Sequence, residues 1–213
     1  MFRRHLLLAG AALLAGGIVI TQAQGPALAD TTTATPGKPA PAFKAVDVNG
    51  KPVSLADFRG KTVVLEWTNH ECPFVQKHYK SGNMQNLQKA AAAEGVVWLT
   101  LLSSAPGEQG HVSVEQAKQL TAERNAAPGN VLFDTDGRIG KLYGAQVTPH
   151  MYVIDAKGVL AYAGAIDDKP STRLADVDGA RNYVREAVAA AKAGKTMDPP
   201  VTRAYGCTIK YVS

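Results

Sequence analysis

Residues 62–79, TVVLEWTNHECPFVQKHY, constrain the fold more than any other part of the chain. A β-branched, apolar run at 62–67 leads into a short polar turn and then into a Cys-Pro pair. Apolar residues on both faces are expected of a buried central strand. A proline is favoured at the first position of a helix. The segment therefore predicts that Cys72 lies where a buried strand passes into a helix.

Strand and helix patterns alternate through the rest of the chain. Two strand-like runs flank Asn49 and Gly50, a pair that favours a tight hairpin turn. Helical spacing is expected over 73–94, with a break at 81–83. Further elements are expected in the order strand (96–104), helix (114–126), strand and turn (130–137), short helix (138–145) and β-hairpin (149–167). The segment 171–195 is then expected to end in an alanine-rich helix closed by Gly194. This order predicts an α/β fold with a mixed central sheet, helices on both of its faces and an N-terminal β-hairpin extension.

The order and several short motifs resemble the redoxin superfamily, which includes alkyl hydroperoxide reductases and thiol-specific antioxidants. The motifs are the N-terminal segment 40–67, CPFV (72–75), SSAPGEQG (103–110), TPHMYVID (148–155), GAIDD (164–168) and GCTIKY (206–211). They are similar to those of a bacterial peroxiredoxin-like group that keeps one cysteine at the first position of the thioredoxin motif. The resemblance covers residues 39–211 and implies a thioredoxin-like fold.

Cys72 is the first candidate for catalysis. A sulfur at a helix start faces free backbone N–H groups and the positive end of the helix dipole. Both favour the thiolate, which is the nucleophile. His70 would add a positive charge nearby, whereas Glu71 would act in the opposite direction. The alternative interpretation is a buried, inert cysteine or half of a structural disulfide.

Cys207 is the second cysteine of the two in the chain. The second position of the thioredoxin motif is Val75, so a partner for Cys72 would have to come from the C-terminal tail. Gly206 permits close backbone approach at that point. We expect Cys207 to act as a resolving cysteine; a static disulfide that fastens the tail is the alternative.

Two more candidates follow from the resemblance. Glu66 precedes Cys72 by six residues, the offset at which thioredoxins carry a buried acid that relays a proton. Burial would raise its pKa and suit it to general acid or base catalysis; a carboxylate that reaches a surface lysine is the alternative. Pro149 occupies the place of the cis-proline that faces the cysteine in thioredoxin-fold proteins and offers a backbone edge to an extended substrate peptide.

The pattern that peroxiredoxins use to bind peroxide is missing. The resemblance implies a Pro-x-x-x-Thr-x-x-Cys loop, but this chain has Leu65 and Asn69 at the proline and threonine positions. The peroxidatic cysteine of that family aligns with Val75. We therefore expect any reaction of Cys72 with peroxide to be slow.

Other ligand classes receive little support from the residues. The net charge is +5, and the lysines and arginines are scattered, so nucleic-acid binding is not indicated. A copper(I) site is the alternative, and its ligands would come from Cys72, Met84 or Met151, and His70, His78, His111 and His150. Scattered histidines are more often surface residues. We expect no metal and no cofactor.

The N-terminus has the features of an export signal. A basic pair at 3–4, an apolar stretch at 6–20 and a small-x-small site at 27–29 predict a signal peptide over 1–29. An uncleaved anchor and a twin-arginine signal are the alternatives. After cleavage we expect no stable membrane insertion. Residues 30–41 read as a flexible linker, 42–196 as the thioredoxin-like domain and 197–213 as a tail that carries the second cysteine.

These observations together predict an exported, periplasmic thiol–disulfide oxidoreductase or redox-responsive protein. Its partners would be protein thiols or disulfides and a redox partner protein. The alternatives are a thioredoxin-fold binding module with a structural disulfide between Cys72 and Cys207, and a slow thiol peroxidase.

Overall fold

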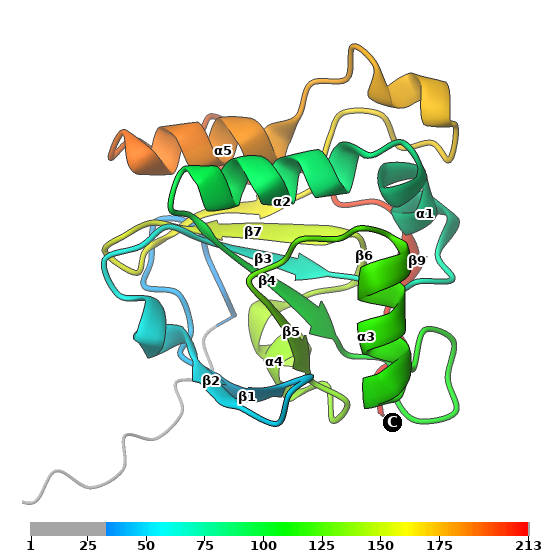
Figure 1. The fold of residues 1–213 in the computed structure, drawn as a ribbon. Helices are drawn as coiled ribbons and strands as arrows, with labels where there is room; N and C mark the ends of the chain where they lie inside the picture. Colours follow the sequence, from blue (N-terminus) through cyan, green and yellow to red (C-terminus); the bar gives the residue numbers. More distant parts are fainter. Residues whose placement is uncertain (1–32, 213) are drawn as a thin grey trace, which may run out of the picture. The chain divides into compact units, whose positions relative to one another are not determined.

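The described part of the chain, residues 33–212 of a computed structural model, is built on a seven-stranded mixed sheet (Figure 1). The strands run in the order β2-β1-β5-β4-β3-β7-β8. Their bounds are β1 (Lys44–Asp47), β2 (Pro52–Ser54), β3 (Val63–Trp67), β4 (Val97–Leu102), β5 (Asn130–Phe133), β7 (His150–Ile154) and β8 (Leu160–Gly164). Strands β3, β4 and β5 are parallel, and the other neighbours are antiparallel. The expected mixed sheet and N-terminal hairpin are both confirmed.

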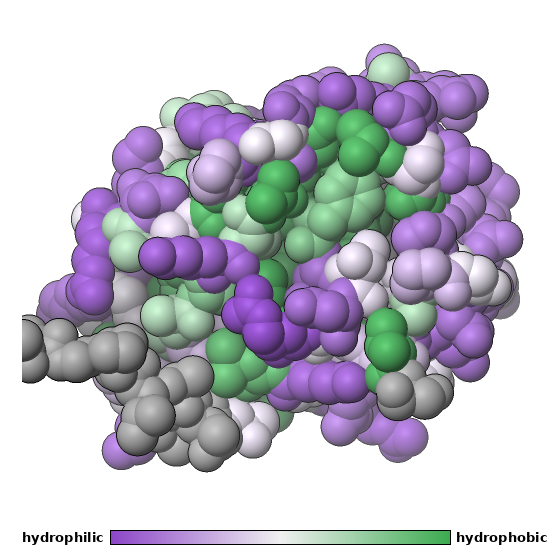
Figure 2. All heavy atoms as spheres, turned by 90° about the horizontal axis from the view of Figure 1, so that it is seen from below, coloured by the Kyte–Doolittle hydropathy of each residue, from purple (hydrophilic) through white to green (hydrophobic). Residues whose placement is uncertain are grey.

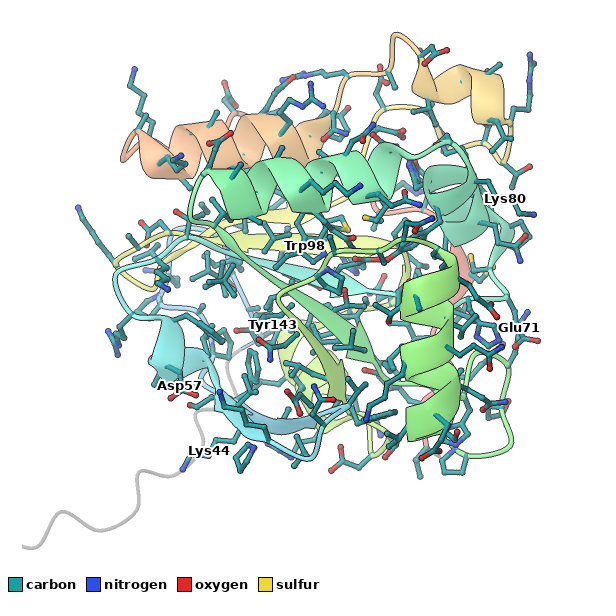
Figure 3. The ribbon with its side chains drawn as sticks, in the orientation of Figure 1. Lys44, Asp57, Glu71, Lys80, Trp98 and Tyr143 are labelled. Atoms are coloured by element: carbon teal, nitrogen blue, oxygen red, sulfur yellow. The ribbon has the colours of Figure 1, made fainter. Side chains whose placement is uncertain are left out.

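Helices lie on both faces of this sheet. Helices α1 (Pro73–Lys80), α2 (Asn83–Ala93) and α5 (Tyr183–Lys192) pack over one apolar cluster, which includes Trp98. Helix α4 (Arg138–Tyr143) packs over a second cluster, which includes Tyr143. Figure 3 shows Trp98 between the sheet and α2, with Tyr143 on the other side of the sheet. The remaining helices of the described residues are α3 (Val114–Glu123) and the short 3-10 helices Leu55–Phe58 and Leu174–Val177.

The side of the molecule with the β1–β2 hairpin carries apolar surface. Figure 2 shows hydrophobic side chains gathered near the middle of this side, with hydrophilic ones around them. Val46 of β1 contributes exposed apolar surface.

The expected break between two helices occurs at Ser81 and Gly82. Gly82 has φ +77°, a conformation that glycine adopts without cost, and it precedes the first residue of α2. The break lets α1 remain short and α2 change direction over the sheet. The first helix thereby stays at the end of β3, where Cys72 lies.

Residues 34–40 differ from the flexible linker that their composition predicts. Ala34, Gly37 and Ala40 donate backbone hydrogen bonds to the carbonyl groups of Leu142, Leu160 and Gly158. Pro39 forms an isolated β-bridge with Val159. These main-chain hydrogen bonds hold the stretch against the rest of the fold. Composition does not reveal them, because every residue except proline carries both a backbone donor and a backbone acceptor. The predicted signal peptide and its cleavage site lie outside the described residues.

The tail follows α5 and crosses the domain to a second, two-stranded sheet. There β9 (Cys207–Thr208) pairs antiparallel with β6 (Val147–Thr148). The sequence did not indicate this pairing, because both strands are only two residues long. This small sheet brings Cys207 to the loop that precedes Pro149.

Candidate functional site

Cys72 lies at the junction that its sequence context predicts. It is the N-cap residue of α1, and Pro73 takes the first helical position. Its backbone N–H donates to the carbonyl oxygen of Asn69 at 3.1 Å, which closes the turn after β3. Backbone N–H groups of the first helical turn have no partner within a helix, so this end attracts negative charge. Cys72 therefore lies at the positive end of the α1 dipole.

The Cys72 sulfur points toward the segment before Pro149. Its Sγ donates to the carbonyl oxygen of Thr148 at 3.1 Å. The backbone N–H of Cys207 donates to the same sulfur at 3.4 Å. The side chain of Cys72 is 0% exposed, because the tail lies over it. The Thr148–Pro149 peptide bond is cis, as expected.

Cys207 is directly opposite Thr148 in the β6–β9 pair. Both cysteines are free thiols in this structure, and Cys207 is the more accessible of the two. Burial, a hydrogen bond to Cys72 and the charge of that sulfur raise the pKa of Cys207 to about 12. Cys207 therefore holds its proton at neutral pH.

Gly206 makes the close approach of the tail possible. Its φ is +140°, in the region that favours glycine. A Cβ atom at this position would collide with the backbone carbonyl group of Thr148. The glycine before Cys207 is therefore required for the tail to lie against the loop of the cis-proline.

Glu66 is fully buried and is surrounded by hydrogen-bond donors. One carboxylate oxygen accepts from the Tyr79 hydroxyl at 3.0 Å. The other accepts from Trp98 Nε1 at 2.8 Å, from the Thr100 hydroxyl at 3.1 Å and from Gln88 Nε2 at 3.3 Å. The carboxylate thus joins β3 to β4, α1 and α2. The alternative of a carboxylate that reaches a surface lysine is wrong.

Burial raises the pKa of Glu66, and the four donors partly offset that rise. None of the hydrogen bonds of the described residues joins Glu66 to Cys72. A proton relay by Glu66 therefore stays a prediction, and in this structure the residue acts as a buried polar centre.

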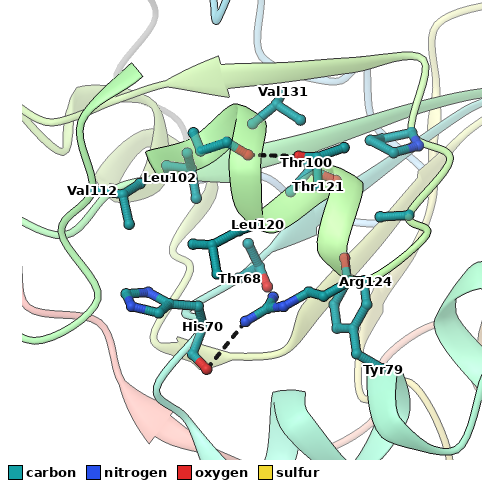
Figure 4. A pocket seen from close by; sticks show the side chains of 13 residues that line it. Thr68, His70, Tyr79, Thr100, Leu102, Val112, Leu120, Thr121, Arg124 and Val131 are labelled. Carbon is teal, nitrogen blue, oxygen red and sulfur yellow. Dashed lines mark hydrogen bonds between the residues drawn. The ribbon is translucent and has the colours of Figure 1, made fainter. Parts of the chain in front are cut away.

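His70 does not supply the positive charge that its place in the sequence suggested. Burial lowers its pKa, and this effect outweighs the opposite effect of Glu71; Arg124 lowers it further. A neutral imidazole is therefore expected at neutral pH. The Arg124 guanidinium donates to the His70 carbonyl oxygen at 3.2 Å, which fixes the turn before Cys72 (Figure 4).

A small pocket lies beside this turn. It is lined by Thr68, His70, Tyr79, Thr100, Leu102, Val112, Ala117, Leu120, Thr121, Arg124, Ala126, Pro128 and Val131 (Figure 4). Neither cysteine contributes to its wall. The Cys72 sulfur therefore does not open into this pocket.

A cluster of buried polar residues beneath the tail was not found from the sequence. The Tyr205 hydroxyl donates to Asp167 and contacts Lys77 Nζ and His78 Nε2, each at 3.2 Å. The side chains of Lys77 and Asp167 are 0% and 1% exposed, and their charged groups are 3.6 Å apart. Lys77 and His78 are consecutive residues of α1, and both side chains approach the Asp167 carboxylate. Nothing local in the sequence links that helix to a tyrosine in the tail.

Burial and the neighbouring groups of the cluster shift the pKa values of Lys77, His78 and Tyr205. Burial lowers the pKa of Lys77, and the Asp167 carboxylate opposes that shift. Burial and the charge of Lys77 lower the pKa of His78 to about 3, so this histidine is neutral at neutral pH. Burial and the hydrogen bond to Asp167 raise the pKa of Tyr205, which therefore keeps its hydroxyl proton.

The model of the AhpC/TSA family matches residues 36–163. The chain belongs to the AhpC/TSA family. The match includes Glu66, Cys72 and Pro149, but it ends before the tail that carries Cys207.

Solved structures show a similar fold over most of the chain. A hypothetical protein from Sinorhizobium meliloti 1021 has 23% identity and a TM-score of 0.71, over 85% of this chain and 97% of its own. An uncharacterized conserved protein from Geobacillus kaustophilus has 25% identity and a TM-score of 0.69, over 84% and 93%. The thioredoxin domain of a thiol-disulfide oxidoreductase from Bacteroides vulgatus has 21% identity and a TM-score of 0.50, over 68% and 96%. No curated protein matches the chain.

Two further properties concern residues 33–212 of this AhpC/TSA protein. None of their helices has the length and apolar character needed to cross a membrane. No group of three or more histidine, cysteine, aspartate or glutamate residues in this range is placed to share a metal ion.

Proposed function

We propose that the protein is an exported thiol–disulfide oxidoreductase that acts on protein thiols or disulfides. Cys72 is its nucleophile and Cys207 its resolving cysteine. The observation that carries this proposal is the contact between the two: the Cys207 N–H lies 3.4 Å from Cys72 Sγ, at the start of a helix and next to a cis-proline.

The exchange proceeds in two balanced steps. The Cys72 thiolate attacks one sulfur of a substrate disulfide; a mixed disulfide forms, and the other substrate sulfur leaves as a thiolate. Cys207 then attacks Cys72 Sγ, which forms the Cys72–Cys207 disulfide and releases the second substrate sulfur, to which the Cys207 proton passes. The substrate is reduced by two electrons and the protein is oxidised by two. A dithiol reductant restores the two thiols; the reverse sequence oxidises a substrate dithiol.

Access to Cys72 requires movement of the tail. A sulfur that is 0% exposed cannot meet a disulfide on another protein. Strands β6 and β9 share only two residue pairs, so their separation disrupts few main-chain bonds. Release of β9 would expose both the thiolate and the backbone edge of β6.

Export is proposed from the sequence of residues 1–29. Secreted and periplasmic compartments permit disulfides to persist, which suits a pair of cysteines that cycle.

A redox-responsive binding module is the second candidate function. The complete burial of Cys72 favours it, because a disulfide formed beneath the tail would be shielded from other proteins. A slow thiol peroxidase is a weaker candidate. Asn69 at the threonine position uses its side chain to bond Glu71 N and the Gln109 carbonyl oxygen, at 2.8 and 3.5 Å.

Substitution of the cysteines separates these possibilities. In the full chain, Cys207→Ser should accumulate mixed disulfides with other proteins through Cys72, because nothing resolves them. Cys72→Ser should accumulate none. Cells that express each variant are quenched with an alkylating agent, and adducts are identified by mass spectrometry with and without reductant. A Cys207→Ser protein that captures no more partner than Cys72→Ser would favour the binding module.

A further inference from the structure

The end of the tail lies in the site as an extended peptide does. Its side chains alternate: Tyr205, Cys207, Ile209 and Tyr211 turn toward the domain, whereas Thr208, Lys210 and Val212 are exposed. Ile209 is 6% exposed within the second apolar cluster. This alternation with backbone pairing is how proteins bind a strand at a sheet edge, with pockets for every second side chain.

The most specific of these pockets receives Tyr205, two residues before the cysteine. The Phe74 ring packs against the Tyr205 ring at 5.7 Å between centroids, and the Lys77 ammonium group lies 5.1 Å from the same ring. The hydroxyl contacts Lys77, His78 and Asp167. A site built to bond a hydroxyl rejects an analogue that lacks it, since its own buried polar groups lose a partner.

The position between the tyrosine and the cysteine is also restricted. Only glycine fits against Thr148 at position 206, because a Cβ atom there would meet a backbone carbonyl group. The site thus holds the sequence Tyr-Gly-Cys, in which the cysteine begins β9 and pairs with Thr148 of β6.

A partner that reaches Cys72 must take the place of the tail, because the sulfur is fully covered while the tail is docked. We propose that the pocket formed by Phe74, Lys77, His78 and Asp167 is a tyrosine-binding site for the partner strand. Its ligand is an extended segment of a partner protein that has tyrosine two residues before the reacting cysteine and glycine one residue before it. The inference rests on the proposed function, since it names the substrate class of that same site.

Short peptide disulfides test this inference on the full chain with Cys207→Ser. The first peptide has the sequence of residues 203–210, with its cysteine joined to nitrothiobenzoate. The second carries phenylalanine in place of tyrosine. The Cys72 thiolate attacks the peptide sulfur, which forms a Cys72–peptide disulfide and releases coloured nitrothiobenzoate. The docked tail competes equally with both peptides, so the ratio of their rates reports the pocket alone.

The tyrosine peptide should react about tenfold faster or more, the effect of leaving buried polar groups without a partner. Equal rates would overturn the inference and leave the proposed function standing. If neither peptide reacts but glutathione disulfide does, the inference is also overturned. If glutathione disulfide fails as well, the proposed function itself falls.

A second measurement needs no peptide. In glutathione buffer, glutathione disulfide oxidises the Cys72–Cys207 pair and is itself reduced to two glutathione thiols. Tyr205→Phe should lower the equilibrium constant for this reaction about tenfold, because the pocket holds its own tail less well. Tyr143→Phe is the matched control, since it removes a hydroxyl bonded to the Pro41 carbonyl oxygen in the other cluster. Equal constants for Tyr205→Phe and the wild type would overturn the inference.

Discussion

Gly206→Ala should largely prevent formation of the Cys72–Cys207 disulfide. The added methyl group would collide with the Thr148 carbonyl group, and the backbone of either the tail or the cis-proline loop must move away. A disulfide requires Cα atoms within about 7 Å of one another, so a displaced tail lowers the effective concentration of Cys207 at Cys72. We expect the equilibrium constant for oxidation in glutathione buffer to fall by about tenfold or more.

Gly60→Ala is the control for this substitution. Gly60 also has a positive φ, +84°, but nothing lies within 4 Å of the Cβ that would be added. Gly60→Ala therefore introduces alanine at a positive φ without a collision. Its equilibrium constant for oxidation should match that of the wild type. If the equilibrium constant for oxidation of Gly206→Ala equals that of the wild type, the docked position of the tail is contradicted.

Glu66→Leu should destabilise the fold strongly. The substitution leaves the donors of Tyr79, Gln88, Trp98 and Thr100 without their acceptor in a buried layer. Each buried group that loses its partner costs about 1–3 kcal/mol, so the free energy of unfolding should fall by about 3–5 kcal/mol. Denaturant unfolding measures the loss. Glu94→Leu removes only the exposed pair of Glu94 with Lys192, and its effect should stay within about 1 kcal/mol.

Glu66→Gln separates charge from packing at the same position. Because burial raises the pKa of Glu66 in the folded protein, the folded state binds more protons than the unfolded state above the usual value of 4.5. The free energy of unfolding of the wild type should therefore fall, relative to that of Glu66→Gln, as the pH rises from 4.5 through the raised pKa. Parallel stability curves for the two proteins would show that Glu66 does not carry a raised pKa.

Local patterns were sufficient for the framework of the fold. The apolar run of β3, the proline after Cys72 and the break at Ser81 and Gly82 each act within a few residues, and the structure places a strand, a helix start and a helix break there. The position of Pro149 opposite Cys72 followed from the resemblance and not from any local pattern.

The parts of the site that depend on distant pairs could not be read in the same way. Tyr205 contacts Lys77 across 128 positions of sequence. The charge of His70 was misjudged because its burial depends on how the turn packs beside Arg124. The stretch 34–40 is held by backbone hydrogen bonds. Every residue type except proline carries both a backbone donor and a backbone acceptor, so the sequence gives no sign of these bonds, and a flexible linker was expected instead.

The state of the two sulfurs tests the central claim most directly. The purified full chain is treated with glutathione disulfide, its free thiols are alkylated, and intact mass and peptide mapping are recorded before and after reductant. We expect Cys72 and Cys207 to lose their thiols together, the protein to become lighter by two hydrogen atoms, and reductant to restore both thiols. A protein that keeps both thiols, or that carries glutathione on one cysteine while the other stays free, would contradict the central claim.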